Sequence, residues 1–94
     1  MREPKKKADL EALKSPFMRV PHFPVRVARY LLDAGYTDLF QLSGRSADSL
    51  LAEIRKRDFL AEEKLVLPAL RLAIYFSENE AAPDKRLLDL HAWE

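Results

Sequence analysis

Apolar residues recur along most of the chain at intervals of three and four positions, which is the spacing of one face of an α-helix. Residues 47–57 fit this spacing without exception, and residues 24–34 carry a second stripe of the same kind. Residues 61–77 are apolar on nearly every side, which is typical of a helix at the centre of a bundle. The pattern therefore predicts three longer helices and an all-α fold.

Proline, glycine and capping residues divide the rest of the chain into shorter pieces. Residues 8–13 and 37–42 predict short helices, and Ser15-Pro16 predicts a helical turn after the first of them. Residues 83–93, which begin with a proline, predict a last helix. We expect a compact domain of five or six helices.

The longest apolar stretch is expected to gather the core around it. Residues from three helices are predicted to be buried together: Leu31, Leu50, Ile54, Leu70, Ala73 and Ile74. Most aromatic residues fall within the apolar periodicity, which favours packing in the core over stacking on bases: Tyr30, Tyr36, Phe40, Phe59, Tyr75 and Phe76. Trp93 either packs against the helical bundle or remains exposed and contacts a partner, and packing against the bundle is the preferred interpretation.

The length of 94 residues gives room for one domain, which we expect to span residues 8–94. Residues 1–7 contain three consecutive lysines and a proline, so they are predicted to form a disordered basic tail. No apolar run is long enough to cross a membrane, and the charged N-terminus is not followed by an apolar signal core. A cytoplasmic protein without membrane contact is therefore expected.

The composition argues against an enzyme. The chain has no cysteine, which removes disulfides, cysteine-based zinc sites and thiol catalysis together. Its two histidines, His22 and His91, lack metal-ligand spacing, and its two glycines are too few for a phosphate-binding glycine loop. The adjacent Glu62 and Glu63 point about 100° apart on a helix, so they do not form an acid–base pair. We expect no enzymatic activity, no metal and no cofactor.

Charge is distributed unevenly, although the net charge is only +1. Residues 1–57 hold 12 basic and 7 acidic side chains, whereas residues 58–94 hold 4 and 8. The basic first part can meet phosphates, and the acidic second part discourages wrapping of nucleic acid around the whole surface.

The most informative stretch is residues 18–42. Here an apolar-proline pair is followed by a four-residue connection, Pro21-His22-Phe23-Pro24, by a helix, and by a return through Gly35. This arrangement resembles a helix-hairpin-helix unit. Such units bind DNA without sequence preference, because backbone N–H groups of the hairpin and of the following helix start point at phosphate oxygens.

The resemblance extends over roughly residues 10–93. The segments that carry it are Ser43-Gly44-Arg45 with Ala47-Asp48-Ser49-Leu50, the run Val66-Leu67…Leu70-Arg71…Ala73-Ile74-Tyr75-Phe76, and the ending Pro83-Asp84…Leu87-Leu88…Trp93. Together they resemble the pathogenicity-locus family of small bacterial helix-hairpin-helix proteins, which are also described as mitomycin-resistance-like. The resemblance implies a compact domain that contacts duplex or single-stranded DNA weakly through phosphates.

Candidate contact residues follow from this resemblance. The hairpin supplies His22, Phe23, Val25 and Arg26, and nearby cations supply possible charge partners: Arg19, Arg29, Arg55, Lys56 and Arg57. The family's hairpin usually carries small residues, commonly glycine, where this chain has His22 and Pro24. Pro24 removes an N–H donor, and His22 adds bulk. The missing glycines favour an alternative function, a protein-interaction or homodimerisation module that keeps the fold without DNA binding.

Overall fold

The computed structural model describes residues 9–94, so the predicted disordered tail of residues 1–7 lies outside the described chain. Over these residues the fold is all-α, as the sequence predicts, and contains no strand. Its α-helices are α1 (Leu10–Leu13), α2 (Val25–Asp33), α3 (Ala47–Arg57) and α4 (Glu63–Glu78). Its short 3-10 helices are η2 (Pro16–Arg19), η3 (Leu39–Leu42), η4 (Lys85–Leu87) and η5 (Leu90–Trp93).

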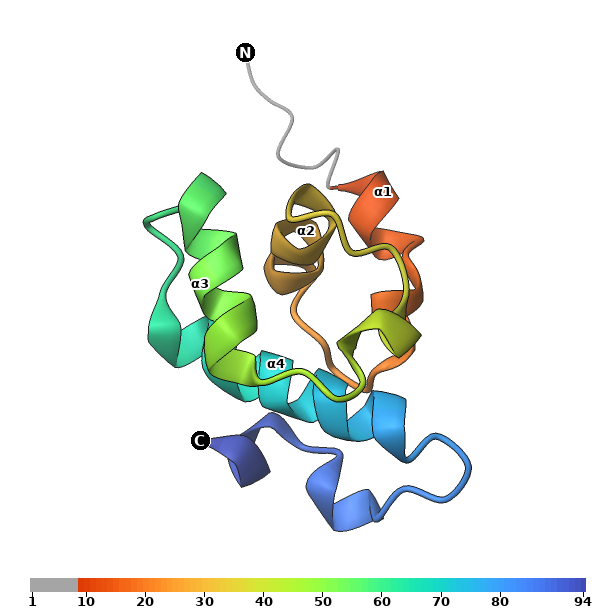
Figure 1. Ribbon diagram of the computed structural model, residues 1–94. Helices are drawn as coiled ribbons and strands as arrows, with labels where there is room; N and C mark the ends of the chain where they lie inside the picture. Colours follow the sequence, from red (N-terminus) through yellow and green to blue (C-terminus); the bar gives the residue numbers. More distant parts are fainter. Residues whose placement is uncertain (1–8) are drawn as a thin grey trace.

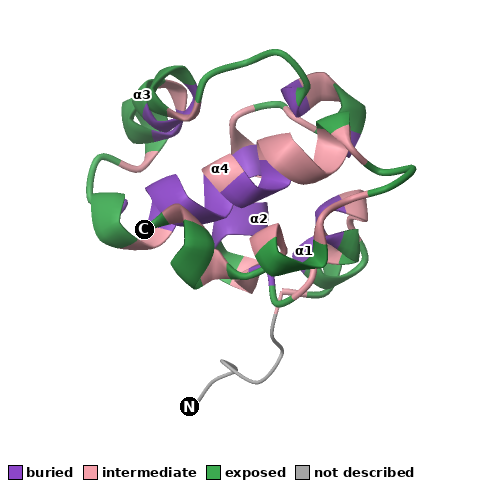
Figure 2. Ribbon diagram, turned by 90° about the horizontal axis from the view of Figure 1, so that it is seen from below, coloured by how far each residue is buried: buried purple, intermediate pink, exposed green. Residues whose placement is uncertain are grey.

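Helix α4 is the centre of the molecule. Figure 1 shows α2 and α3 on one side of α4 and the C-terminal segment with η4 and η5 on the other. Burial is concentrated along α4 from Val66 to Ala73, and Figure 2 shows the same concentration of buried positions. Pro68 lies inside α4 without ending it, although the proline has no N–H to donate to the carbonyl of Lys64.

The predicted core is confirmed for five of its six residues. Leu31, Leu50, Ile54, Leu70 and Ala73 are all buried in one apolar cluster, and Ile74 packs against it half-buried. Each of the three longer helices thus buries the face that its periodicity predicts.

The expected number of five or six helices is wrong, because the described residues form only four α-helices. The clearest difference lies in residues 83–93, where η4 and η5 replace one continuous helix. Asp84 accepts a hydrogen bond from the N–H of Arg86, and Asp89 accepts one from the N–H of His91. Aspartate side chains that bond nearby backbone groups in this way compete with helix continuation. Two capped turns form instead.

Two aromatic residues depart from the core prediction. Phe40 is 71% exposed and Phe59 is 76% exposed, whereas the other four aromatics in the predicted set are half-buried. Phe40 lies on the four-residue η3, and Phe59 lies in the turn between α3 and α4. Neither residue lies in a helix long enough to have one buried face, so the spacing of apolar residues does not predict burial at these positions.

Trp93 docks over the bundle, as preferred from the sequence. Its indole Nε1 donates to the carbonyl of Leu87 at 2.8 Å, and its ring centroid lies 5.5 Å from that of Tyr75 on α4. Arg71 adds a bond from its guanidinium to the carbonyl of Trp93 at 2.9 Å. These contacts hold the C-terminal segment against α4.

Candidate nucleic-acid interface

The segment between η2 and α2 is a tight turn. The N–H of Phe23 donates to the carbonyl of Val20 at 3.2 Å, and His22 has a φ of 57°. A proline at the second position and a positive φ at the third are the pattern of a type II turn. Glycine usually occupies the third position, and histidine is one of the few other residues that is enriched in the left-handed region. His22 therefore has a backbone conformation that glycine adopts more easily than histidine does.

Helix α2 begins directly after this turn, with Pro24 as its N-cap. The N–H groups of Val27 and Ala28 donate to the carbonyl of Pro24, at 3.1 and 3.2 Å. The N–H groups of Val25 and Arg26 have no acceptor within residues 9–94. Because the first N–H groups of a helix point outward along its positive end, these two donors are available to an anion.

The side chains of the predicted hairpin residues differ in accessibility. His22 and Arg26 are exposed, and Arg26 forms no ion pair with any residue of the described chain. Phe23 is buried, and Val25 packs half-buried against the core. Phe23 and Val25 can therefore face a ligand only through their backbone atoms.

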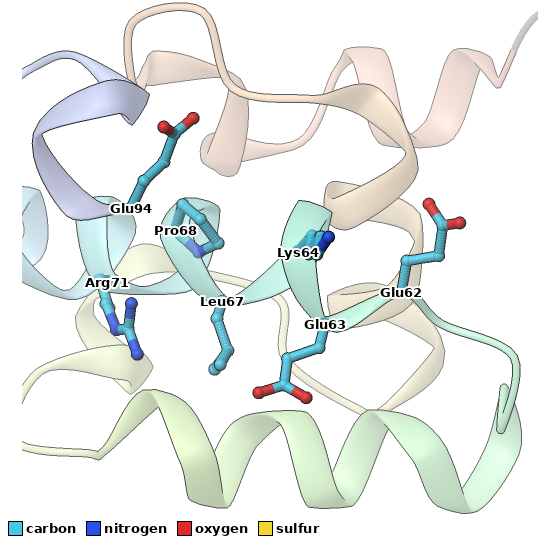
Figure 3. A pocket seen from close by; sticks show the side chains of 7 residues that line it. All are labelled: Glu62, Glu63, Lys64, Leu67, Pro68, Arg71 and Glu94. Atoms are coloured by element: carbon cyan, nitrogen blue, oxygen red, sulfur yellow. The ribbon is translucent and has the colours of Figure 1, made fainter.

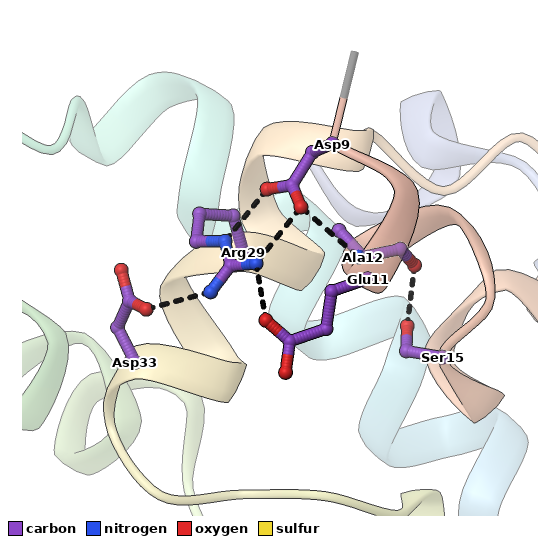
Figure 4. A network of polar contacts seen from close by, with 6 residues as sticks. All are labelled: Asp9, Glu11, Ala12, Ser15, Arg29 and Asp33. Atoms are coloured by element: carbon purple, nitrogen blue, oxygen red, sulfur yellow. Dashed lines mark hydrogen bonds and ion pairs between the residues drawn. The ribbon is translucent and has the colours of Figure 1, made fainter. Parts of the chain in front are cut away.

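Arg29 is surrounded by carboxylates (Figure 4). Its guanidinium donates to Asp9 at 2.6 and 2.8 Å, to Glu11 at 2.7 Å and to Asp33 at 2.9 Å. The hydrogen bond from Arg29, with a further one from the N–H of Ala12, lowers the pKa of Asp9 from 3.8 to about 2. The same carboxylates raise the pKa of the Arg29 guanidinium. Three carboxylates around one cation leave this part of α1 and α2 negative rather than positive.

Arg19 forms an ion pair as well. Its guanidinium bonds the carboxylate of Glu80 in the loop after α4. This contact ties the end of η2 to a segment 61 residues further along the chain. The two candidate charge partners closest to the hairpin in sequence, Arg19 and Arg29, are thus both engaged with carboxylates.

The C-terminal segment brings Lys85 and His91 close to His22. A hollow of about 480 Å³ is lined by His22 together with residues of the C-terminal segment, namely Lys85, Leu88, Asp89, Leu90 and His91. Sequence reasoning missed Lys85 and His91 as partners of His22, because no local pattern indicates that residues more than sixty positions apart will meet. The only sequence signal was the excess of polar residues over residues 84–91.

The remaining predicted cations lie at the end of α3. Arg55 donates to the carbonyl of Ala61 through Nε at 3.3 Å and Nη2 at 3.2 Å. Lys56 and Arg57 are exposed. None of the three lines the hollow beside His22, so the structure does not combine them with the hairpin into one pocket.

A larger open cleft of about 920 Å³ runs along α4. Figure 3 shows that Glu62 and Glu63 point in different directions. The expected helical position of Glu62 is wrong, because Glu62 is the N-cap of α4 with an extended backbone and only Glu63 lies in the helix. The cleft also mixes three acidic with two basic side chains; its lining is Glu62, Glu63, Lys64, Leu67, Pro68, Arg71 and Glu94. This mixture presents no surface of one charge to a ligand.

Residues 9–94 contain no group of three or more metal-ligating side chains placed to hold an ion. In the same part of the chain, no helix is both long enough and apolar enough to span a bilayer. No family model, curated protein or solved structure matches this chain.

Proposed function

We propose that this domain binds nucleic acid weakly and without sequence preference, through phosphate contacts of a helix-hairpin-helix type. The observation that carries the proposal is the pair of unpaired N–H groups of Val25 and Arg26 at the start of α2, reached through a turn with a left-handed His22. A helix N-terminus of this kind favours an anion through both hydrogen bonds and the helix dipole.

Two further features support phosphate as the ligand. Arg26 projects from the first turn of α2, is exposed and is not neutralised by a carboxylate of the described residues. Lys85 adds a donor beside His22, where Asp89 is the acidic residue of the lining. His91 also lines this hollow, and its Nδ1 is bonded to Glu94 at 3.0 Å. These proposed contacts are made to the phosphate backbone and not to base edges. We therefore expect the binding to be independent of the nucleotide sequence.

The salt dependence of DNA binding tests this proposal. The protein is titrated with labelled duplex DNA at two salt concentrations, and we expect the logarithm of affinity to fall by about 0.9 per contacted phosphate for each logarithmic unit of salt. Arg26→Ala should reduce that slope by about 1, whereas Lys64→Ala, an equal loss of charge on α4, should leave it unchanged. Absence of salt-dependent binding by the unmodified protein would refute the proposal.

The backbone donor is tested separately. Val25→Pro removes one N–H at the first position of α2, where helices accept proline because its φ already fits. Val25→Ala is the matched control, since it truncates the same side chain and keeps the donor. We expect weaker DNA binding by Val25→Pro than by Val25→Ala at similar stability. Equal affinities would show that the N–H of Val25 makes no phosphate contact.

A second function is favoured by one observation. Arg19 and Arg29 are both bound to carboxylates, which leaves less positive charge around the hairpin than the sequence implies. The alternative is a protein-interaction or dimerisation module that keeps this fold. Sedimentation of the protein alone distinguishes the two, because a homodimerisation module associates with increasing concentration and in the absence of DNA.

A further inference from the structure

The turn between α3 and α4 presents two large apolar side chains to solvent. Phe59 is 76% exposed and Leu60 is 79% exposed, the highest values among the large apolar residues of the described chain. They are neighbours in sequence and both lie in this turn. Exposed apolar groups that gather in this way mark contact sites more often than isolated ones do.

The backbone of this turn is held firmly. The N–H of Asp58 donates to the carbonyl of Ile54 at 2.8 Å, and the N–H of Ala61 donates to the carbonyl of Asp58 at 2.9 Å. Ala61 is itself buried, and its carbonyl receives the two bonds from Arg55. Phe59 and Leu60 therefore occupy the two central positions of a closed turn whose ends are anchored, which directs both side chains outward.

Folding does not account for these two residue types. The central positions of turns favour proline, glycine, asparagine, aspartate and serine, because these residues supply the required backbone angles or local hydrogen bonds. Phenylalanine and leucine supply neither, and at this position they remain in contact with water. Their presence is explained more readily by a partner that covers them than by the stability of the turn.

The charge around the turn indicates the chemistry of that partner. Arg55, Lys56 and Arg57 form the last turn of α3, and the nearest carboxylates along the chain are Asp58 and Glu53. Glu53 pairs with Arg45 instead, at 3.0 Å. Lys56 and Arg57 are exposed and form no ion pair with the described residues. An exposed aromatic ring next to unpaired cations is the combination that binds a single nucleic-acid strand, since bases stack on the ring and phosphates meet the cations.

We infer that Phe59 stacks on an unpaired base while Lys56 and Arg57 contact the adjoining phosphates, so that the domain prefers single-stranded over duplex nucleic acid. Leu60 lies against the same nucleotide and shields the stacked pair from water. This inference rests on the proposed function, because it supplies a second contact to a chain whose phosphates the hairpin also binds. It depends on different residues, so the two can fail separately.

The test compares two aromatic residues of similar exposure. Phe59→Ala and Phe40→Ala each remove one exposed ring, and neither should change the melting temperature of the protein. We expect Phe59→Ala to weaken binding to a labelled single strand by at least about fivefold, the effect of losing one stacked base, while its duplex binding changes much less. Phe40→Ala should bind both DNAs as the unmodified protein does.

Two further variants separate stacking from general apolar contact. Phe59→Trp keeps a stacking surface and should retain or improve single-strand affinity, with fluorescence quenching beyond that of Trp93. Phe59→Leu keeps an apolar side chain without a ring and should lose as much affinity as Phe59→Ala.

The same variants define the results that overturn the inference. If Phe59→Ala binds a single strand with unchanged affinity while Arg26→Ala weakens it, the hairpin function stands and the stacking contact is refuted. If Phe59→Ala and Leu60→Ala instead reduce binding to vesicles of anionic phospholipid and not to DNA, the turn contacts a membrane surface. If the unmodified protein binds neither DNA form, the proposed function fails and this inference fails with it.

Discussion

At the scale of single residues, ion pairs decide which cations remain available. Arg19 and Arg29 belong to the basic part of the sequence, yet each is held by carboxylates, whereas Arg26 between them is not. The partners Glu80 and Asp9 lie 61 and 20 residues away along the chain. No local pattern connects residues at such separations, although Asp33, four positions after Arg29 on α2, is a partner within local reach. The sequence could therefore nominate the arginines as charge partners but could not show that Arg19 would be engaged.

The ion pair between Asp9 and Arg29 makes the free energy of unfolding depend on pH in the acidic range. Because the fold lowers the pKa of Asp9 from 3.8 to about 2, the unfolded chain takes up this proton first as the pH falls. The stabilisation is present above a pH of about 4 and is lost as the pH falls through about 2. Asp9→Asn keeps a capping side chain for α1 without the charge, so it should be less stable than the unmodified protein at neutral pH and lose less on acidification.

Urea unfolding at neutral pH and at a pH of about 2 measures this difference. Asp48→Asn is the control, since Asp48 lies in the first turn of α3, near the position that Asp9 holds as N-cap of α1, but has no arginine partner in the described chain. An acid-induced loss of stability that is the same in the unmodified protein and in Asp9→Asn would show that the pair contributes nothing.

At the scale of elements, the three longer helices, the short α1 and the turn η2 form where the sequence predicts them, whereas two other short segments differ in type. Helix α3 spans the predicted residues 47–57, capped by Ser46, whose hydroxyl accepts from the N–H of Ser49 at 3.1 Å. Such helices are specified by their own apolar stripe and cap. The segments at residues 37–42 and 83–93 lack room for a full stripe, so capping aspartates and tertiary contacts determine their shape, and they form 3-10 turns.

Helix α4 is the element on which the core depends. Leu70 lies in its buried middle and has no exposed surface. We expect Leu70→Ala to lower the free energy of unfolding by about 2–5 kcal/mol, since it removes buried methyl groups and leaves a cavity. Leu60→Ala makes the same change at a position that is 79% exposed, and it should shift stability by less than about 0.5 kcal/mol. Chemical denaturation measures the free energy of unfolding of both variants. Equal losses of stability in Leu70→Ala and Leu60→Ala would contradict the central role of α4.

At the scale of the whole molecule, the C-terminal segment connects the core to the hairpin. Trp93 fixes this segment on α4, and the segment in turn carries Lys85 and His91 to His22. The sequence indicated that Trp93 would dock, but it could not indicate which surface the docked segment would complete. Which residues the C-terminal segment meets depends on how the other elements pack around α4, and this packing is a property of the assembled fold.

Trp93→Ala should therefore affect two properties together. We expect a loss of about 2 kcal/mol in stability, because a half-buried ring and its hydrogen bond to Leu87 disappear. DNA binding should weaken as well, since Lys85 is no longer held beside the hairpin. Fluorescence-detected titration and urea unfolding measure the two effects. If affinity persists unchanged while stability falls, Lys85 and His91 take no part in the contact.

The division of the C-terminal segment into two short turns also has a consequence for motion. Short 3-10 turns have few backbone hydrogen bonds and little buried surface, so they open at a lower free-energy cost than the buried middle of α4. Amide hydrogen exchange should consequently be fast over residues 85–93 and slowest in α4. As temperature rises, the hollow beside His22 should open while the helical core is still intact, so that the domain loses its ligand before it melts.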